Sequence, residues 1–130
     1  MIILRQARGR WRLVFVVYAI GLFVATHWPQ LRISGPPIRS DLIMHLCAFG
    51  GWAFCFTATA WVGNWNSWFG LRWPFAIGIA YAALDEGLQA IPALGRTCAW
   101  DDFAANCAGV GLGIAGARLA REYVHNRRNI

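Results

Sequence analysis

Four apolar segments, separated by short stretches rich in proline, glycine and polar residues, dominate the 130-residue chain. Consecutive prolines at Pro36-Pro37 and a proline at Pro92 interrupt helices, because proline lacks an amide hydrogen and clashes with the preceding turn. Each segment has the roughly 20 predominantly apolar residues that a helix needs to cross a bilayer core. The sequence therefore predicts one domain over residues 1–130, an all-α, four-transmembrane-helix bundle with spans at about 11–28, 40–63, 73–91 and 101–121.

The composition favours a membrane protein over a soluble one. Hydrophobic residues make up 58% of the chain and charged residues only 14%, whereas soluble domains carry about 25% charged residues. The arginines at 5–12, followed by the apolar stretch 13–25, also fit a signal peptide. Three further apolar segments follow, so we favour an uncleaved first span.

The basic residues indicate an orientation. All twelve are arginines, and in a four-span topology nine of them fall on the side that holds both termini and the middle loop. The positive-inside rule then places both termini in the cytoplasm. The net charge of +6 does not indicate nucleic-acid binding, because no basic stripe is interleaved with groove-reading polar residues. The arginines expected on the opposite side are Arg32, Arg39 and Arg96.

Several other patterns limit the possibilities. The four cysteines form no CxxC pair and predict no structural disulfide. No compact ligand motif such as HExxH predicts a metal site, although Asp41, His45, Glu86 and Asp102 are all competent ligands for a divalent metal. No cofactor and no oligomeric state can be assigned. Small residues recur every four positions in the last segment, which favours close helix packing inside the bundle over a dimer interface. These residues are Ala105, Gly109, Gly113 and Ala117.

The acidic residues are distributed asymmetrically. Only Glu122 of the six falls on the cytoplasmic side of the predicted topology. Residues three or four positions apart share a helix face, so the two members of each polar pair point in the same direction. Three helices each carry one such pair. Arg96, in the loop between the last two segments, can reach the same region. The outward acids are Asp41, Asp85, Glu86, Asp101 and Asp102, and the pairs are Asp41/His45, Glu86/Gln89 and Asp102/Asn106.

Helix capping explains some of these acids without any function. Ser40 or Asp41 is expected as an N-cap, and Asp101 or Asp102 opens the last helix, where negative charge is favourable. Capping does not explain Asp85 and Glu86, which lie about two turns before the end of a predicted span. An ionised side chain costs several kcal/mol at membrane depth, so a functional site is the default hypothesis for both.

These residues also carry a resemblance to a known family. The motifs are Asp41-Leu-Ile-Met-His45, Asp85-Glu86-Gly-Leu-Gln89 with Arg96 downstream, and Asp102-Phe-Ala-Ala-Asn106. In this order, over residues 14–117, the chain resembles the VanZ-like family of small bacterial membrane proteins. The resemblance implies a membrane location and an outward-facing polar site, with Asp101 as an addition to the family pattern. The family's namesake is linked to teicoplanin resistance, but the resemblance assigns neither a reaction nor resistance to this chain.

The leading hypothesis is a site that binds or modifies a lipid-linked or cell-envelope molecule, with membrane lipids as partners. Glu86 would act as general acid or base, and His45 would be oriented by Asp41. Arg96 would hold an anionic headgroup such as a phosphate. The catalytic candidates are therefore Glu86, His45, Asp41 and Asp102, and the substrate-binding candidates are Arg96, Gln89, Asn106 and Asp85. A proton-coupled relay and a purely structural polar network are the alternatives, and whether the chain is an enzyme stays open.

Overall fold

The computed structural model describes residues 2–28, 40–62, 67–91 and 99–127. These residues form four α-helices and one short 3-10 helix, and they contain no strand. The predicted all-α class is confirmed. The elements are α1 (Ile2–His27), α2 (Ser40–Thr59), η1 (Trp68–Leu71), α3 (Arg72–Gln89) and α4 (Trp100–Arg127).

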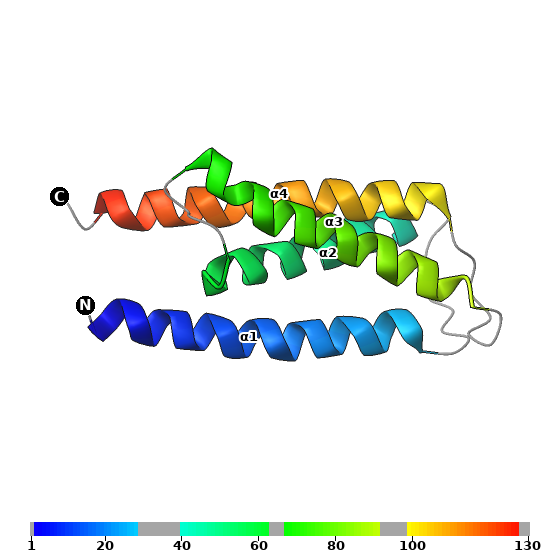
Figure 1. Cartoon of the computed structure of the whole chain (residues 1–130), viewed down its shortest axis with the longest axis horizontal. Helices are drawn as coiled ribbons and strands as arrows, with labels where there is room; N and C mark the ends of the chain where they lie inside the picture. The colour runs from blue at the N-terminus through cyan, green and yellow to red at the C-terminus, as the bar shows by residue number, and fades with distance from the viewer. Residues whose placement is uncertain (1, 29–39, 63–66, 92–98, 128–130) are drawn as a thin grey trace.

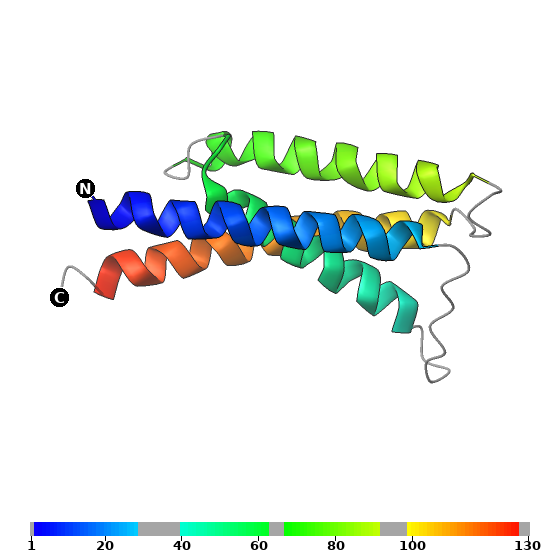
Figure 2. The same cartoon turned by 90° about the horizontal axis from the view of Figure 1, so that it is seen from below.

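Successive helices run in alternating directions along one long axis (Figure 1). The start of α1 and the end of α4 therefore lie at the same end of the bundle. The end of α1, the start of α2, the end of α3 and the start of α4 gather at the opposite end, which we call the polar end. The most extensive contact is between α2 and α4, while α1 packs chiefly on α2 and α3 chiefly on α4. Figure 2 shows the start of α2 and the end of α3 diverging toward the polar end, although the two helices are in contact nearer their middles.

Three of the described helices are long and apolar enough to cross a membrane, over Gly9–His27, Asp41–Thr59 and Trp100–Arg127. The 18-residue α3 is not among them, because it carries charged residues at both ends: Arg72, Asp85 and Glu86. Many large apolar side chains are exposed on the outer face of α1, including Leu13, Val17 and Ile20. An exposed apolar surface of this extent is consistent with an integral membrane protein.

The α2–α4 contact depends on glycine. A Cβ atom at Gly109 would collide with the Leu46 carbonyl oxygen, and one at Gly113 with the Gly50 carbonyl oxygen. The two backbones therefore touch, which only residues without a side chain allow. We call this contact, made by Leu46, Gly50, Gly109 and Gly113, the glycine seam. The predicted stripe of small residues packs inside the chain's own bundle.

An aromatic cluster joins the other helices to this pair. The Phe15 ring of α1 packs edge-on against Trp52 of α2, with ring centroids 5.3 Å apart. Tyr81 of α3 stacks on the same indole, with ring centroids 4.9 Å apart. Phe49 and Val110 are fully buried beside them. Aromatic rings carry large buried areas, so this cluster supplies much of the apolar contact that positions α1 and α3.

Three helix ends differ from the predicted segments. The helix α2 ends at Thr59 rather than near residue 63, because Ala60 adopts a left-handed conformation with φ 54°. Such a residue terminates a helix by turning the chain away from its axis. Conversely, α1 begins at Ile2 and α4 continues to Arg127, beyond the apolar stretches. The length of an apolar stretch predicts the membrane-spanning part of a helix. It does not predict the helical turns that continue into polar sequence.

Candidate polar site at one end of the bundle

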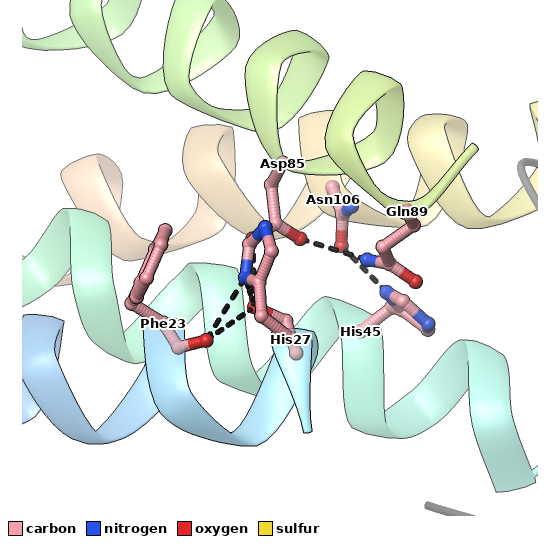
Figure 3. Close-up of polar contacts among 7 residues, drawn as sticks. Phe23, His27, His45, Asp85, Gln89 and Asn106 are labelled. Atoms are coloured by element: carbon pink, nitrogen blue, oxygen red, sulfur yellow. Dashed lines mark hydrogen bonds and ion pairs between the residues drawn. The ribbon is translucent and has the colours of Figure 1, made fainter. Parts of the chain in front are cut away.

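The polar end brings together most of the residues that the sequence singles out. Asp85, Glu86 and Gln89 project from the last turns of α3 toward the bundle and are at most 4% exposed. Asn106 of α4 is fully buried across from them, and His45 of α2 lies beside it (Figure 3). Both α3 carboxyl groups are therefore inside the protein rather than on a lipid-facing surface. Arg96 lies outside the described residues.

Asp85 is held by donors from two helices. One carboxylate oxygen, Oδ1, accepts a hydrogen bond from the Thr26 hydroxyl of α1 at 2.7 Å. The other, Oδ2, accepts from the Gln89 amide nitrogen one turn further along α3 at 2.9 Å. The His27 ring nitrogen Nδ1 lies 3.8 Å from Oδ1. Asp85 therefore anchors the end of α1 to the end of α3 and fixes the orientation of the Gln89 amide.

Glu86 faces the start of α4. Its Oε1 accepts a hydrogen bond of 2.7 Å from the backbone amide of Ala99, the residue before the first one of that helix. Helix starts carry unpaired N–H groups and a partial positive charge, which favour a carboxylate. The partial positive charge at the start of α4 thus offsets the unfavourable interaction of the Glu86 carboxylate with the negative end of the α3 dipole. The second oxygen, Oε2, is buried and has no hydrogen-bond partner in the described structure.

His45 bridges α2 and α4. Its Nδ1 lies 3.1 Å from the Asn106 side-chain oxygen, and its Nε2 lies 3.7 Å from an Asp102 carboxylate oxygen. Because Asp102 and Asn106 are one helical turn apart, the imidazole spans both positions. Glu86 of α3 faces the start of the same helix, α4, through its hydrogen bond with Ala99. These four side chains gather at the junction of α2, α3 and α4.

The structure does not bring Asp41 into this cluster. Asp41 is exposed, and it makes no hydrogen bond or ion pair with any described residue. The expected orientation of His45 by Asp41 is replaced by contacts across the helix pair, to Asn106 and Asp102. Asp41 lies within the first turn of α2, as Asp101 and Asp102 lie within the first turn of α4. In these positions the negative carboxylates interact favourably with the helix dipole.

Three buried polar atoms in this region lack a hydrogen-bond partner among the described residues: Glu86 Oε2, Asn106 Nδ2 and His27 Nε2. Leaving such an atom unpaired costs about 1–3 kcal/mol. An unpaired carboxylate oxygen and an unpaired amide nitrogen in one cluster offer an acceptor and a donor to a ligand. The carboxyl and imidazole groups can also exchange a proton with that ligand.

Two contributors from α1, Thr26 and His27, are not among the predicted site residues. A threonine near the end of an apolar segment carries no signal of its own, and only the approach of α1 to α3 gives it a partner. The sequence likewise offers no spacing that links His27 to Asp85.

No group of three or more His, Cys, Asp or Glu side chains within the described ranges is arranged to hold a metal ion. Of the cysteines, Cys47, Cys55 and Cys107 are free, and Cys98 lies outside the described residues. Comparisons of the chain with protein-family models, with curated proteins and with solved structures found no match.

Proposed function

We propose that the chain is a VanZ-like membrane protein whose four helices all span a bacterial inner membrane. Both termini are cytoplasmic and the polar end faces the extracytoplasmic side. There the protein binds or modifies a lipid-linked or cell-envelope molecule with an anionic headgroup. The support comes from the three sequence motifs, the apolar helices and the geometry of the polar end.

The observation that carries this proposal is the incomplete pairing of Glu86 and Asn106. Both are almost fully buried, and each uses one polar atom within the protein and leaves the other unpaired among the described residues. A purely structural polar network is most stable when every member is satisfied. Unpaired atoms of opposite hydrogen-bonding character are what a binding site needs before its ligand arrives.

The placement of α3 as a fourth span has its own support. Eighteen helical residues extend about 27 Å, close to the thickness of a bilayer core. The two carboxylates that lower its apolar character are turned into the bundle, and Arg72 lies at the opposite end. There the Arg72 guanidinium sits 3.7 Å from the Phe69 ring centre and 5.3 Å from that of Trp73. Aromatic and arginine side chains together are typical of the cytoplasmic membrane interface.

Within the proposed site the residues take different roles. Glu86 exchanges a proton with the ligand or accepts a hydrogen bond from it. Asn106 donates a hydrogen bond to the ligand. His45 connects Asn106 to Asp102 and holds both in register. Arg96 binds the anionic headgroup, as the motif spacing suggests. Asp85 acts indirectly, by fixing Gln89 and the end of α1.

Lipid analysis of the purified protein tests the proposal. We expect an anionic lipid or lipid-linked molecule to be enriched over the bulk membrane, and the Arg96→Ala variant to lose it. Arg39→Ala is the matched control, because Arg39 is expected on the same membrane side but outside the motifs. Wild-type protein with no enriched lipid would contradict the proposed function. Equal loss of the lipid in both variants would show that overall positive charge, rather than Arg96 itself, retains the lipid.

A further inference from the structure

Two buried atoms at the polar end have no partner among the described residues, and their hydrogen-bonding characters are opposite. Glu86 uses Oε1 to bind the Ala99 amide, so Oε2 of the carboxylate is a remaining acceptor. Asn106 directs its oxygen at His45 (Figure 3), so Nδ2 is a remaining donor. Glu86 is 4% exposed and Asn106 is fully buried. A ligand that completes both side chains must donate one hydrogen bond and accept another.

The two side chains serve different parts of α4. Glu86 binds at Ala99, just before the first residue of the helix, and Asn106 lies about two turns further along it. Polar groups spread over a headgroup fit this arrangement better than one polar group at a single point. His45 and Asp102, whose side chains are 13% and 18% exposed, form the edge from which a headgroup can approach.

The charges of the described side chains disfavour an ionic group at this place. Asp85, Glu86 and Asp102 contribute three carboxyl groups to the polar end. A phosphate only accepts hydrogen bonds, so it could complete Asn106 but would meet Glu86 as a like charge. An ammonium group only donates, so it could complete Glu86 but not Asn106. A hydroxyl group both donates and accepts, and it adds no charge.

The arginines of the described helices are too far away to neutralise a phosphate here. All of them lie toward the opposite end of the bundle, in the first parts of α1 and α3 and the last part of α4. They are Arg5, Arg8, Arg10, Arg12, Arg72, Arg118, Arg121 and Arg127. The described part of the polar end therefore contains no arginine that could pair with a phosphate.

Exposed apolar side chains beside the polar end indicate that the ligand is carried by a lipid. Ile43 of α2, Leu84 of α3 and Trp100 of α4 are 58%, 59% and 84% exposed. Each lies one or two residues along the chain from a polar residue of this end. Apolar surface next to polar groups suits a molecule with both an acyl chain and a polar headgroup. A free sugar or polyol would leave that apolar surface uncovered.

We propose that the ligand presents to Glu86 and Asn106 an uncharged part of its headgroup with at least two hydroxyl groups, such as a glycerol or a sugar. One hydroxyl donates to Glu86 Oε2, and another accepts from Asn106 Nδ2. The phosphate that joins such a headgroup to its lipid stays outside this cluster. This inference rests on the proposed function, for which it specifies the chemical class of the ligand.

Native mass spectrometry of the full chain in detergent tests this inference. Three lipids with identical acyl chains are offered in equal amounts. Phosphatidylglycerol carries two headgroup hydroxyls, phosphatidic acid a bare phosphate and phosphatidylethanolamine an ammonium group. We expect bound phosphatidylglycerol to exceed each of the others by roughly tenfold or more, because a missing hydroxyl leaves buried polar groups unpaired. Free glycerol at the same concentration should not displace it.

Two variants each invert one hydrogen-bonding atom. Glu86→Gln keeps the oxygen for Ala99 and replaces the acceptor with an NH2 donor, so the preference over phosphatidic acid should be lost. Asn106→Asp keeps the oxygen for His45 and replaces the donor with an acceptor, so the preference over phosphatidylethanolamine should be lost. Glu122→Gln, in the exposed pair on α4, is the matched control and should keep both preferences. A substitution that only weakens the fold lowers the binding of all three lipids alike.

The outcomes separate this inference from the proposed function. Equal binding of phosphatidylglycerol and phosphatidic acid would overturn the hydroxyl-bearing headgroup and leave an anionic ligand standing. Preferred binding of phosphatidylethanolamine, or displacement by free glycerol, would also overturn the inference. A wild-type preference that survives in both variants would remove Glu86 and Asn106 from the site, and if one variant does not fold, the other decides. Binding of none of the three lipids would contradict the proposed function as well.

Discussion

The two helices α2 and α4 hold together in different ways along their length. In the glycine seam, backbones touch at Gly50, Gly109 and Gly113, and the contact contains no charge. One turn further toward the polar end, the same two helices meet through His45 and Asn106. The seam sets the helix separation, and that separation places the imidazole within reach of the amide. A rigid apolar contact next to a polar cluster keeps functional side chains in position.

The seam should be the most sensitive part of the molecule. Gly113→Val would drive a branched side chain into the Gly50 carbonyl, with an expected loss of at least about 1–3 kcal/mol in stability. The matched control is Gly111→Val, since a Cβ at Gly111 meets nothing within 4 Å. Thermal loss of folded protein in detergent measures both. Similar melting temperatures for the two variants would show that the seam does not determine the helix separation.

The Asp85 anchor should come next. Asp85→Ala removes a buried acceptor that both the Gln89 amide and the Thr26 hydroxyl use. We expect a loss of about 1–3 kcal/mol, seen as a lower melting temperature in detergent. Asp41→Ala, at an exposed carboxylate on α2, should stay within about 0.5 kcal/mol of wild type. An Asp85→Ala protein as stable as Asp41→Ala would mean that Asp85 anchors nothing.

The smallest effect is expected at the end of the bundle opposite the polar end. Arg118 donates to Glu122 at 2.8 Å, one turn apart on α4, but the Glu122 side chain is about half exposed. Exposed pairs of this kind contribute roughly 0.3–0.5 kcal/mol. Glu122→Gln should therefore lower the melting temperature very little, and less at high salt than at low salt. A loss as large as that of Asp85→Ala would remove the contrast between buried and exposed acids.

Much of the fold could be predicted from the sequence because apolar length and helix breakers are local signals. The helices, their alternating order and the gathering of Asp85, Glu86 and Asn106 at one end all follow from such signals. The ends of the helices did not follow, since Ala60 ends α2 through a backbone conformation that its side chain does not reveal. Nor does apolar length show how far α4 continues into polar sequence.

The partners within the site were harder to predict than its members. The four-residue spacing along α2 predicts that Asp41 pairs with His45, but the imidazole instead lies beside Asn106 and Asp102 of α4. Contacts between helices depend on their separation and rotation, which a single sequence does not display. Thr26 illustrates the same limit, because its hydroxyl gains a role only where α1 meets Asp85.

The most direct test of the proposed site is a paired measurement on Glu86→Gln, comparing the amount of folded protein in the membrane with the amount of co-purifying anionic lipid. Glutamine keeps an oxygen for the Ala99 amide, removes the charge and the exchangeable carboxyl proton, and replaces the unpaired carboxylate oxygen with an NH2 group. We expect near wild-type accumulation of folded protein together with loss of the bound lipid. Reduced accumulation with the lipid content per folded molecule unchanged would show that the buried carboxylates serve structure alone.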